Sequence, residues 1–286
     1  MAASSESFDV TRPGDELCLV DRLRAYVERW QLDLPLLPDA PRRVMELCDR
    51  ESCDALALTE LIHQDPAMAG HVLRVARSPL YATRVPVVSL RQAVSLLGLR
   101  AIREIALLIA CQARVFKVRG HEEEVRDVFR HSLAAAFFAR EIARLRRWNV
   151  EEAFLCGLLH DVGRPLLLQA AVDLSLTPEP GELERALDAL HERVGAMLAD
   201  HWELPEAVAQ AMGMHHADPL AESTPRVAVQ TALADALAGV ALERAGSNPL
   251  AILEHPALER LSLYPDDVRA LLRRSSEAAL MARSLA

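Results

Sequence analysis

Apolar residues recur at helical spacing along almost the whole chain. Between about residues 15 and 31 they stand at Leu17, Val20, Leu23 and Val27, with charged residues between them, which is the pattern of an amphipathic helix. Similar stretches follow, and no segment alternates for long at the two-residue period of a strand. The pattern therefore predicts an all-α fold.

Capping residues mark where several of these helices begin and end. Asp65 followed by Pro66 is a helix start, because proline is tolerated in a first turn. Ser89 and Gln92 form a capping-box pattern, and Gly98 is a suitable terminator for the helix between them. We expect helices at about 15–31, from 39, at 58–63, 66–76, 89–98, 99–115 and 125–146, from 150, at 182–202, from 205 and from 225.

A polar block at residues 117–124 breaks the apolar periodicity and predicts a boundary between two subdomains. We expect an N-terminal helical subdomain over residues 15–116 and a second subdomain over 122–243. The helices within 244–286 are expected to pack on the core, because apolar stripes are most often buried in their own domain. The polar start, residues 1–14, is expected to be frayed.

Composition narrows the class of protein. A chain of 286 residues with 51% hydrophobic and 26% charged residues is long and apolar enough for a packed globular core. Its formal charge of -9 argues against sequence-independent binding to nucleic acid or to an anionic membrane. No apolar run is long enough to span a bilayer, and the five cysteines lack paired spacing, which favours a reduced, cytoplasmic setting.

The strongest candidate chemistry lies where an apolar helix ends in His160 and Asp161. Burying an unpaired carboxylate is costly, so Asp161 needs a cation, hydrogen-bond donors or water. Further imidazoles and one carboxylate stand on other apolar helices, namely His131, His191, His215, His216 and Asp235. Together these seven residues could ligate zinc, iron or manganese, whereas each taken alone is more often a hydrogen-bonded core or surface residue. A metal centre and a hydrogen-bond network are both consistent with the pattern.

The order of these residues resembles a known signature. His131, then the adjacent His160 and Asp161, then Asp235 resemble the H…HD…D pattern of the HD superfamily of metal-dependent phosphohydrolases. Other segments resemble the HDOD family, the HD-related output domain of bacterial signalling proteins, and these are residues 34–38, 61–66, 73–81, 88–98 and 195–205.

The resemblance implies an N-terminal helical subdomain packed on an HD-like helical subdomain. It also implies a regulatory or output scaffold in bacterial signal transduction, with protein partners in two-component or cyclic di-GMP pathways and one or two divalent ions in the HD core. His131, His160, Asp161 and Asp235 match the superfamily's core ligands, and His191, His215 and His216 match additional ligands of HD-GYP phosphodiesterases.

A metal-dependent phosphohydrolase acting on a nucleotide or cyclic dinucleotide is the alternative. In it Asp161 and Arg164 would be the catalytic residues, with Asp161 bridging two ions and Arg164 stabilising phosphate. Two departures count against it, because no Gly-Tyr-Pro motif follows His216 and Arg164 stands where a lysine is common. The scaffold is the favoured interpretation.

Overall fold

The computed structural model describes residues 18–29, 34, 39–48, 50, 54–77, 87–114, 117–179 and 181–285, and these contain helices and no strand. In chain order the helices are α1 (Leu19–Glu28), α2 (Asp39–Cys48), α3 (Ala55–His63), α4 (Pro66–Ala76), α5 (Leu90–Arg114), α6 (Glu122–Arg146), α7 (Val150–Leu159), α8 (Gly163–Asp173), α9 (Glu182–His201), α10 (Glu206–Met214), α11 (Arg226–Ala241), α12 (Pro249–Ile252), α13 (Ala257–Arg260), α14 (Pro265–Leu272) and α15 (Ser275–Leu285). The predicted all-α fold is confirmed. The segment expected to be frayed, residues 1–14, lies outside the described residues.

The predicted capping interactions are present in the first half of the chain. The Asp65 carboxylate accepts a hydrogen bond from the backbone N–H of Met68 at 3.1 Å, at the start of α4. Ser89 and Gln92 exchange side-chain-to-backbone hydrogen bonds, both at 3.2 Å, as a capping box requires. Gly98 adopts a φ of 76°, which only glycine takes up without strain, and it kinks α5 instead of ending it. The two helices expected on either side of Gly98 therefore form one bent element.

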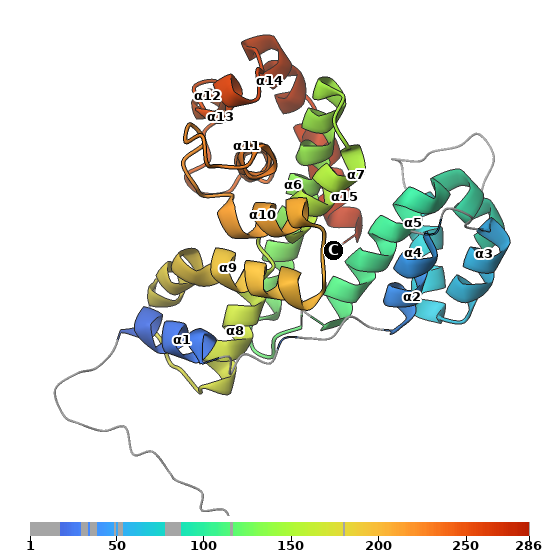
Figure 1. Ribbon diagram of the computed structural model, residues 1–286, viewed down its shortest axis with the longest axis horizontal. Helices are drawn as coiled ribbons and strands as arrows, with labels where there is room; N and C mark the ends of the chain where they lie inside the picture. The colour runs from blue at the N-terminus through green and yellow to red at the C-terminus, as the bar shows by residue number, and fades with distance from the viewer. Residues whose placement is uncertain are drawn as a thin grey trace, which may run out of the picture.

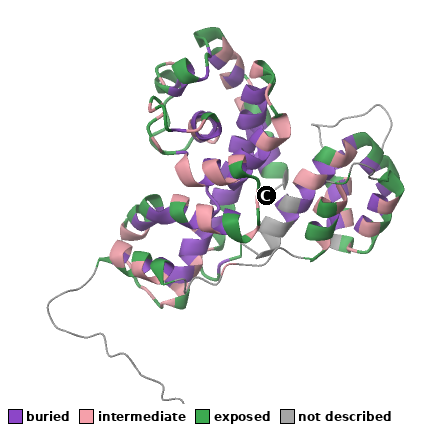
Figure 2. Ribbon diagram, viewed as in Figure 1, coloured by how far each residue is buried: buried purple, intermediate pink, exposed green. Residues whose placement is uncertain are grey.

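The helices form two lobes (Figure 1). In the α2–α5 lobe, α2, α3 and α4 pack against the long helix α5. The second lobe, called the α6 lobe here, contains α1 and α6 to α15, and α7, α11 and α15 lie against its central helix α6. Phe137, Phe138 and Ile142 of α6 are completely buried, each worth about 1.5–3 kcal/mol of hydrophobic stabilisation. Figure 2 shows that burial is concentrated along this central helix and its neighbours.

The C-terminal helices close one side of the α6 lobe. Helix α15 lies against α6 and α11, and it buries Ala278, Met281 and Ala282 in these contacts. Helices α12, α13 and α14 contact α11. This end of the chain therefore contributes apolar side chains to the core around α6.

The first helix lies in the α6 lobe, which corrects the expected boundary of an N-terminal subdomain over residues 15–116. Helix α1 packs against α8 and α9, on the opposite side of the molecule from the α2–α5 lobe (Figure 1). Leu19, Leu23 and Val27 are buried there, and the backbone N–H of Leu19 donates to Glu182 at 3.2 Å. Amphipathic periodicity shows that a helix has a face to bury but does not identify the surface that covers it.

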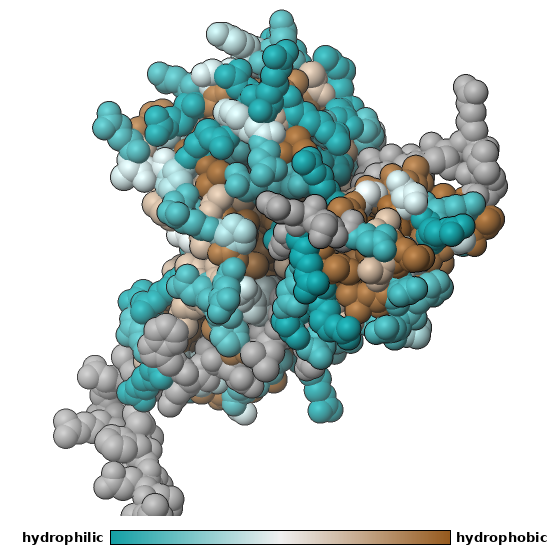
Figure 3. Space-filling view, turned by 45° about the vertical axis from the view of Figure 1, so that its right-hand side comes forward, coloured by the Kyte–Doolittle hydropathy of each residue, from teal (hydrophilic) through white to brown (hydrophobic). Residues whose placement is uncertain are grey.

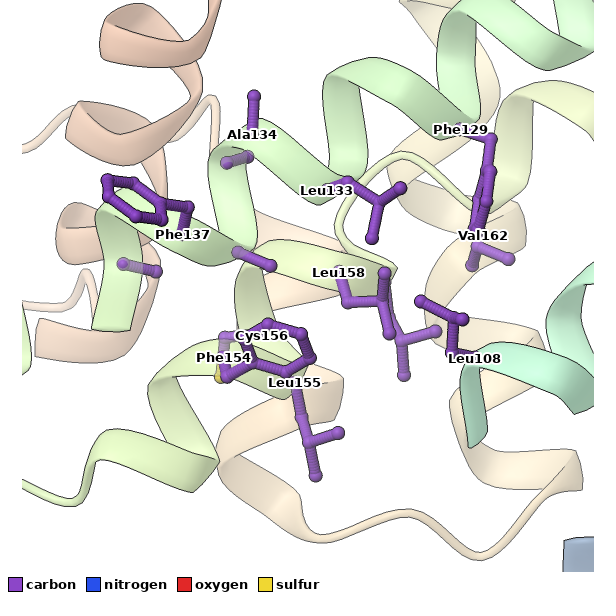
Figure 4. Close-up of a cluster of buried hydrophobic side chains, with 14 of the residues drawn as sticks. Leu108, Phe129, Leu133, Ala134, Phe137, Phe154, Leu155, Cys156, Leu158 and Val162 are labelled. Atoms are coloured by element: carbon purple, nitrogen blue, oxygen red, sulfur yellow. The ribbon is translucent and has the colours of Figure 1, made fainter. Parts of the chain in front are cut away.

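The two lobes meet where α5 approaches α6 and α7. Figure 4 shows Leu108 of α5 in the same apolar cluster as Phe129 of α6 and Val162, which follows α7. Arg100 of α5 also forms an ion pair with Glu151 of α7 at 2.6 Å. The α2–α5 lobe is thus packed on the α6 lobe, and it contacts the turn that follows α7.

Glu104 makes this junction sensitive to pH. Burial raises the pKa of the Glu104 carboxyl to about 7, although Arg140 favours its charged form. Because this pKa lies above the ordinary value, the stability that Glu104 contributes is complete below about pH 4.5 and is lost as the pH rises through 7. We therefore expect Glu104→Gln to unfold nearly like the wild type at pH 5 and to be more stable at pH 8, by about 1 kcal/mol because the side chain keeps some contact with water.

Thermal unfolding followed by circular dichroism at both pH values checks this expectation. The exposed Glu60→Gln on α3 is a matched control that should unfold like the wild type at both. An equal difference between Glu104→Gln and the wild type at pH 5 and pH 8 would contradict the role of charge at this position.

Apolar side chains also reach the surface. Figure 3 shows them gathered on the α2–α5 lobe, and the exposed large hydrophobic residues of that lobe include Leu56 and Leu96, with exposed fractions of 53% and 37%. Surface of this kind often marks a protein contact. Among the helices of the described residues, none has the length and apolar character needed to cross a membrane.

Candidate metal centre

The turn between α7 and α8 places His160 and Asp161 at the centre of the α6 lobe. Helix α7 is capped by Asn149, whose side chain accepts hydrogen bonds from two backbone N–H groups at 3.1 and 3.2 Å. Its apolar residues are buried through to Leu159, and His160 and Asp161 follow directly. Gly163 then starts α8 against the backbone of α9, where an added Cβ would lie 2.0 Å from the carbonyl oxygen of His191. The sequence therefore holds the His-Asp pair rigidly beside His191.

Four other helices bring the remaining candidates to this turn. His131 lies on α6, His191 on α9 and Asp235 on α11, while His215 and His216 follow the last residue of α10. The structure thus collects all seven residues predicted from the sequence. His131, His160, Asp161, His191 and His215 are buried, the side chain of Asp235 is 27% exposed, and His216 is exposed.

The first group consists of His131, His160, Asp161 and Asp235. Nε2 of His131 donates to an Asp235 oxygen at 2.6 Å. Nε2 of His160 lies 3.6 Å from Asp161 and 3.8 Å from Asp235, which is too far for hydrogen bonds. This nitrogen is buried and has no hydrogen-bond partner among the described residues. A buried, unpartnered imidazole nitrogen between two carboxylates is a suitable position for a cation.

The second group consists of His191, His215 and His216. The Nε2 atoms of His191 and His215 are 3.1 Å apart, and the rings of His215 and His216 have centroids 4.2 Å apart. One oxygen of Asp161 lies 3.5 Å from Nε2 of His191 and 3.9 Å from Nε2 of His215. Asp161 therefore joins the two groups, with His160 and the first group on its other side.

Backbone carbonyl groups fix the tautomers of three histidines. The Nδ1 atoms of His160, His191 and His215 lie 2.9, 2.9 and 3.0 Å from carbonyl oxygens within their own helical turns. A carbonyl oxygen only accepts hydrogen bonds, so each Nδ1 carries the hydrogen and Nε2 of the neutral ring carries a lone pair. All three lone pairs belong to nitrogens that lie within 4 Å of Asp161.

The electrostatics of the centre require positive charge. Burial lowers the pKa of His215 to about 2 and also lowers the pKa of His191, so both rings are neutral near pH 7 and their facing lone pairs repel. Burial opposes charge on His160 as well, but Asp161 and Asp235 outweigh it and raise the pKa of His160 to about 9. Burial likewise opposes ionisation of Asp161, yet His160 and Arg164 hold the pKa of this carboxyl well below its usual range. The centre therefore takes up a proton or another cation.

This donor set fits a divalent metal ion. Imidazole nitrogens with free lone pairs and ionised carboxylates are the usual ligands of zinc, iron and manganese. Two sets of three residues have ligand atoms within 4.8 Å of one another, namely His131, His160 and Asp161, and His191, His215 and His216. Hydrogen bonds from Nδ1 to backbone carbonyls are also one of the usual ways in which metal-binding histidines are oriented.

Three acidic residues of α9 border the centre and were not identified from the sequence. Glu184 and Asp188 accept hydrogen bonds from Arg164 at 3.1 and 2.5 Å. Glu192 accepts one from the backbone N–H of His216 at 2.8 Å and lies 3.6 Å from Nδ1 of His215. Their regular spacing of four residues on the helix that carries His191 is a signal by which they could have been found.

Comparison with solved structures agrees with this fold. A crystal structure of a proposed metal-dependent phosphohydrolase from Shewanella amazonensis superposes with a TM-score of 0.75 at 21% identity, covering 94% of this chain and 98% of that one. A crystal structure of an HDOD domain protein with unknown function from Geobacter sulfurreducens gives 0.72 at 24% identity, covering 93% and 98%. At these identities the likeness shows the fold.

Sequence comparison identifies the family. An uncharacterized protein of Treponema pallidum is 22% identical over 196 residues, which are 64% of this chain and 38% of that protein, so the chain spans well under half of this relative. The sequence model of the HDOD domain family matches residues 34–218 of this chain. These residues include six of the seven candidate ligands and leave out Asp235. The chain belongs to the HDOD family.

Proposed function

We propose that this protein is a bacterial signal-transduction scaffold whose HD-like core holds divalent metal, with iron, manganese or zinc as the candidate ions. The observation that carries the metal assignment is the 3.1 Å separation between the Nε2 atoms of His191 and His215, both of which carry lone pairs. Two such lone pairs in a buried site repel unless a cation lies beside them. A bound ion would supply the positive charge that these nitrogens and Asp161 require.

The protein's own residues prepare this site. Backbone carbonyls orient His160, His191 and His215, and Arg164 donates to Asp161 at 3.2 Å. In a phosphohydrolase Arg164 would stabilise phosphate beside the metal ions, but Arg164 already donates to three carboxylates. The exposed apolar side chains of the α2–α5 lobe are instead suited to a signalling protein partner. These two features favour the scaffold.

Elemental analysis tests the metal assignment. We expect the chain, produced without a His tag, to contain stoichiometric metal, and Asp161→Ala to contain almost none because Asp161 contacts both groups of histidines. Asp127→Ala on the exposed face of α6 is a matched control and should keep its metal. If the wild type contains no metal even after reconstitution under reducing conditions, the metal assignment is wrong. The positive charge in the cluster then comes from protons alone.

A further inference from the structure

Arg164 is enclosed by carboxylates. Its Nε donates to Asp161 at 3.2 Å, and its two terminal nitrogens donate to Glu184 at 3.1 Å and to Asp188 at 2.5 Å. Only 13% of the Arg164 side chain is exposed, whereas Glu184 and Asp188 are 65% and 58% exposed. Binding phosphate in the usual bidentate way requires two adjacent nitrogens of the guanidinium. Each nitrogen of Arg164 already has a carboxylate partner.

Other carboxylates near Arg164 also oppose the binding of phosphate. Five carboxylates belong to the centre or contact Arg164, His215 or His216. These are Asp161, Glu184, Asp188, Glu192 and Asp235. Metal ions at the histidines would be attracted by these charges. A phosphate group approaching Arg164 would instead have to displace Glu184 and Asp188 and remain close to both.

We propose that Glu184 and Asp188 act as a clamp that reserves Arg164 for Asp161, so that the centre accepts cations and rejects phosphate groups. In this arrangement Arg164 is a positioning residue, because it orients the carboxylate that joins the two groups of histidines. The inference rests on the proposed metal centre and specifies its ligand class. It also predicts that opening the clamp creates an anion site.

Titration calorimetry with inorganic phosphate at constant ionic strength tests the clamp. The full chain is titrated after manganese reconstitution and again after chelation, and its metal content is measured separately. We expect Glu184→Gln/Asp188→Asn to bind phosphate about tenfold more tightly than the wild type. Phosphate then no longer has to displace two exposed ion pairs from Arg164. The charge-matched control Asp200→Asn/Glu203→Gln, with one exposed residue in the last turn of α9 and one just after the helix, should bind like the wild type.

A third change identifies the group that binds the anion. Adding Arg164→Gln to the double variant should return phosphate affinity to the wild-type value, and circular dichroism establishes that each variant is folded. If the double variant does not fold, Asp188→Asn alone carries the comparison, because its contact with Arg164 is the shortest of the three. A wild type that binds phosphate as tightly as the open variant, or a gain that survives Arg164→Gln, overturns the clamp. Wild-type protein that holds neither manganese nor zinc or iron refutes the metal centre instead, and the chelated titration still decides the clamp.

Discussion

Gly163→Ala is expected to destabilise the protein by at least about 3 kcal/mol and to abolish metal binding. A Cβ on residue 163 would lie 2.0 Å from the carbonyl oxygen and 2.8 Å from the carbonyl carbon of His191. These are backbone atoms, so the clash is relieved only by moving α8 away from α9. That movement would separate Asp161 from Nε2 of His191, which lie 3.5 Å apart. Stability and the metal site therefore depend on the same close approach.

Urea unfolding and elemental analysis of the variant measure the two effects. Gly70→Ala is the matched control, because Gly70 lies within α4 and a Cβ there would meet no atom within 4 Å. This change should stabilise the protein by about 0.5 kcal/mol, since alanine loses less backbone freedom than glycine on folding. A Gly163→Ala protein with wild-type stability and full metal content would show that α8 and α9 are not held as closely as described.

Binding of metal to the stripped protein should raise its melting temperature by roughly 10 °C. A ligand present at a thousand times its dissociation constant stabilises the native state by about 4 kcal/mol, and each kcal/mol raises the midpoint by about 2–4 °C in a chain of this size. In the stripped protein the buried Nε2 of His160 has no hydrogen-bond partner among the described residues, and the lone pairs of His191 and His215 face each other. A bound metal ion would give the Nε2 of His160 a partner and would accept the lone pairs of His191 and His215.

Thermal unfolding with increasing manganese, zinc or ferrous iron, the last under anaerobic conditions, gives this shift directly. His215→Ala should remove most of the increase, because His215 contacts both His191 and Asp161. His201→Ala is a matched control on an exposed position of α9, and it should show the full increase. Equal increases in the two variants would mean that the ions bind elsewhere on the protein.

The sequence predicted the helices and the convergence of the seven candidate residues well, because both depend on local chemistry. Asp65 and Ser89 cap helices through atoms only a few residues away, so their roles can be inferred without the fold. His160 and Asp161 end an apolar helix, and a charged side chain in such a position needs partners wherever it lies. That need, combined with imidazoles on other apolar helices, was enough to predict which residues converge.

The features that were missed depend on which surfaces meet. The pattern of α1 showed an apolar face but not that α8 and α9 cover it. Arg164 was expected to face phosphate because its charge is evident from the sequence, whereas its partners Glu184 and Asp188 come from a helix about 20 residues further on. Exposed acidic residues are common on helices, and only the packing of α8 against α9 selects these two.

The path of the first helix has a consequence for synthesis on the ribosome. Residue Leu19 pairs with Glu182, 163 positions later, and Glu28 pairs with Arg193 at 2.9 Å. Helix α1 leaves the ribosome early, but the surface that covers it does not exist until α9 has been made. Meanwhile the α2–α5 lobe, whose contacts are local, can fold as a unit. During translation the apolar face of α1 therefore stays unprotected until α9 has been made.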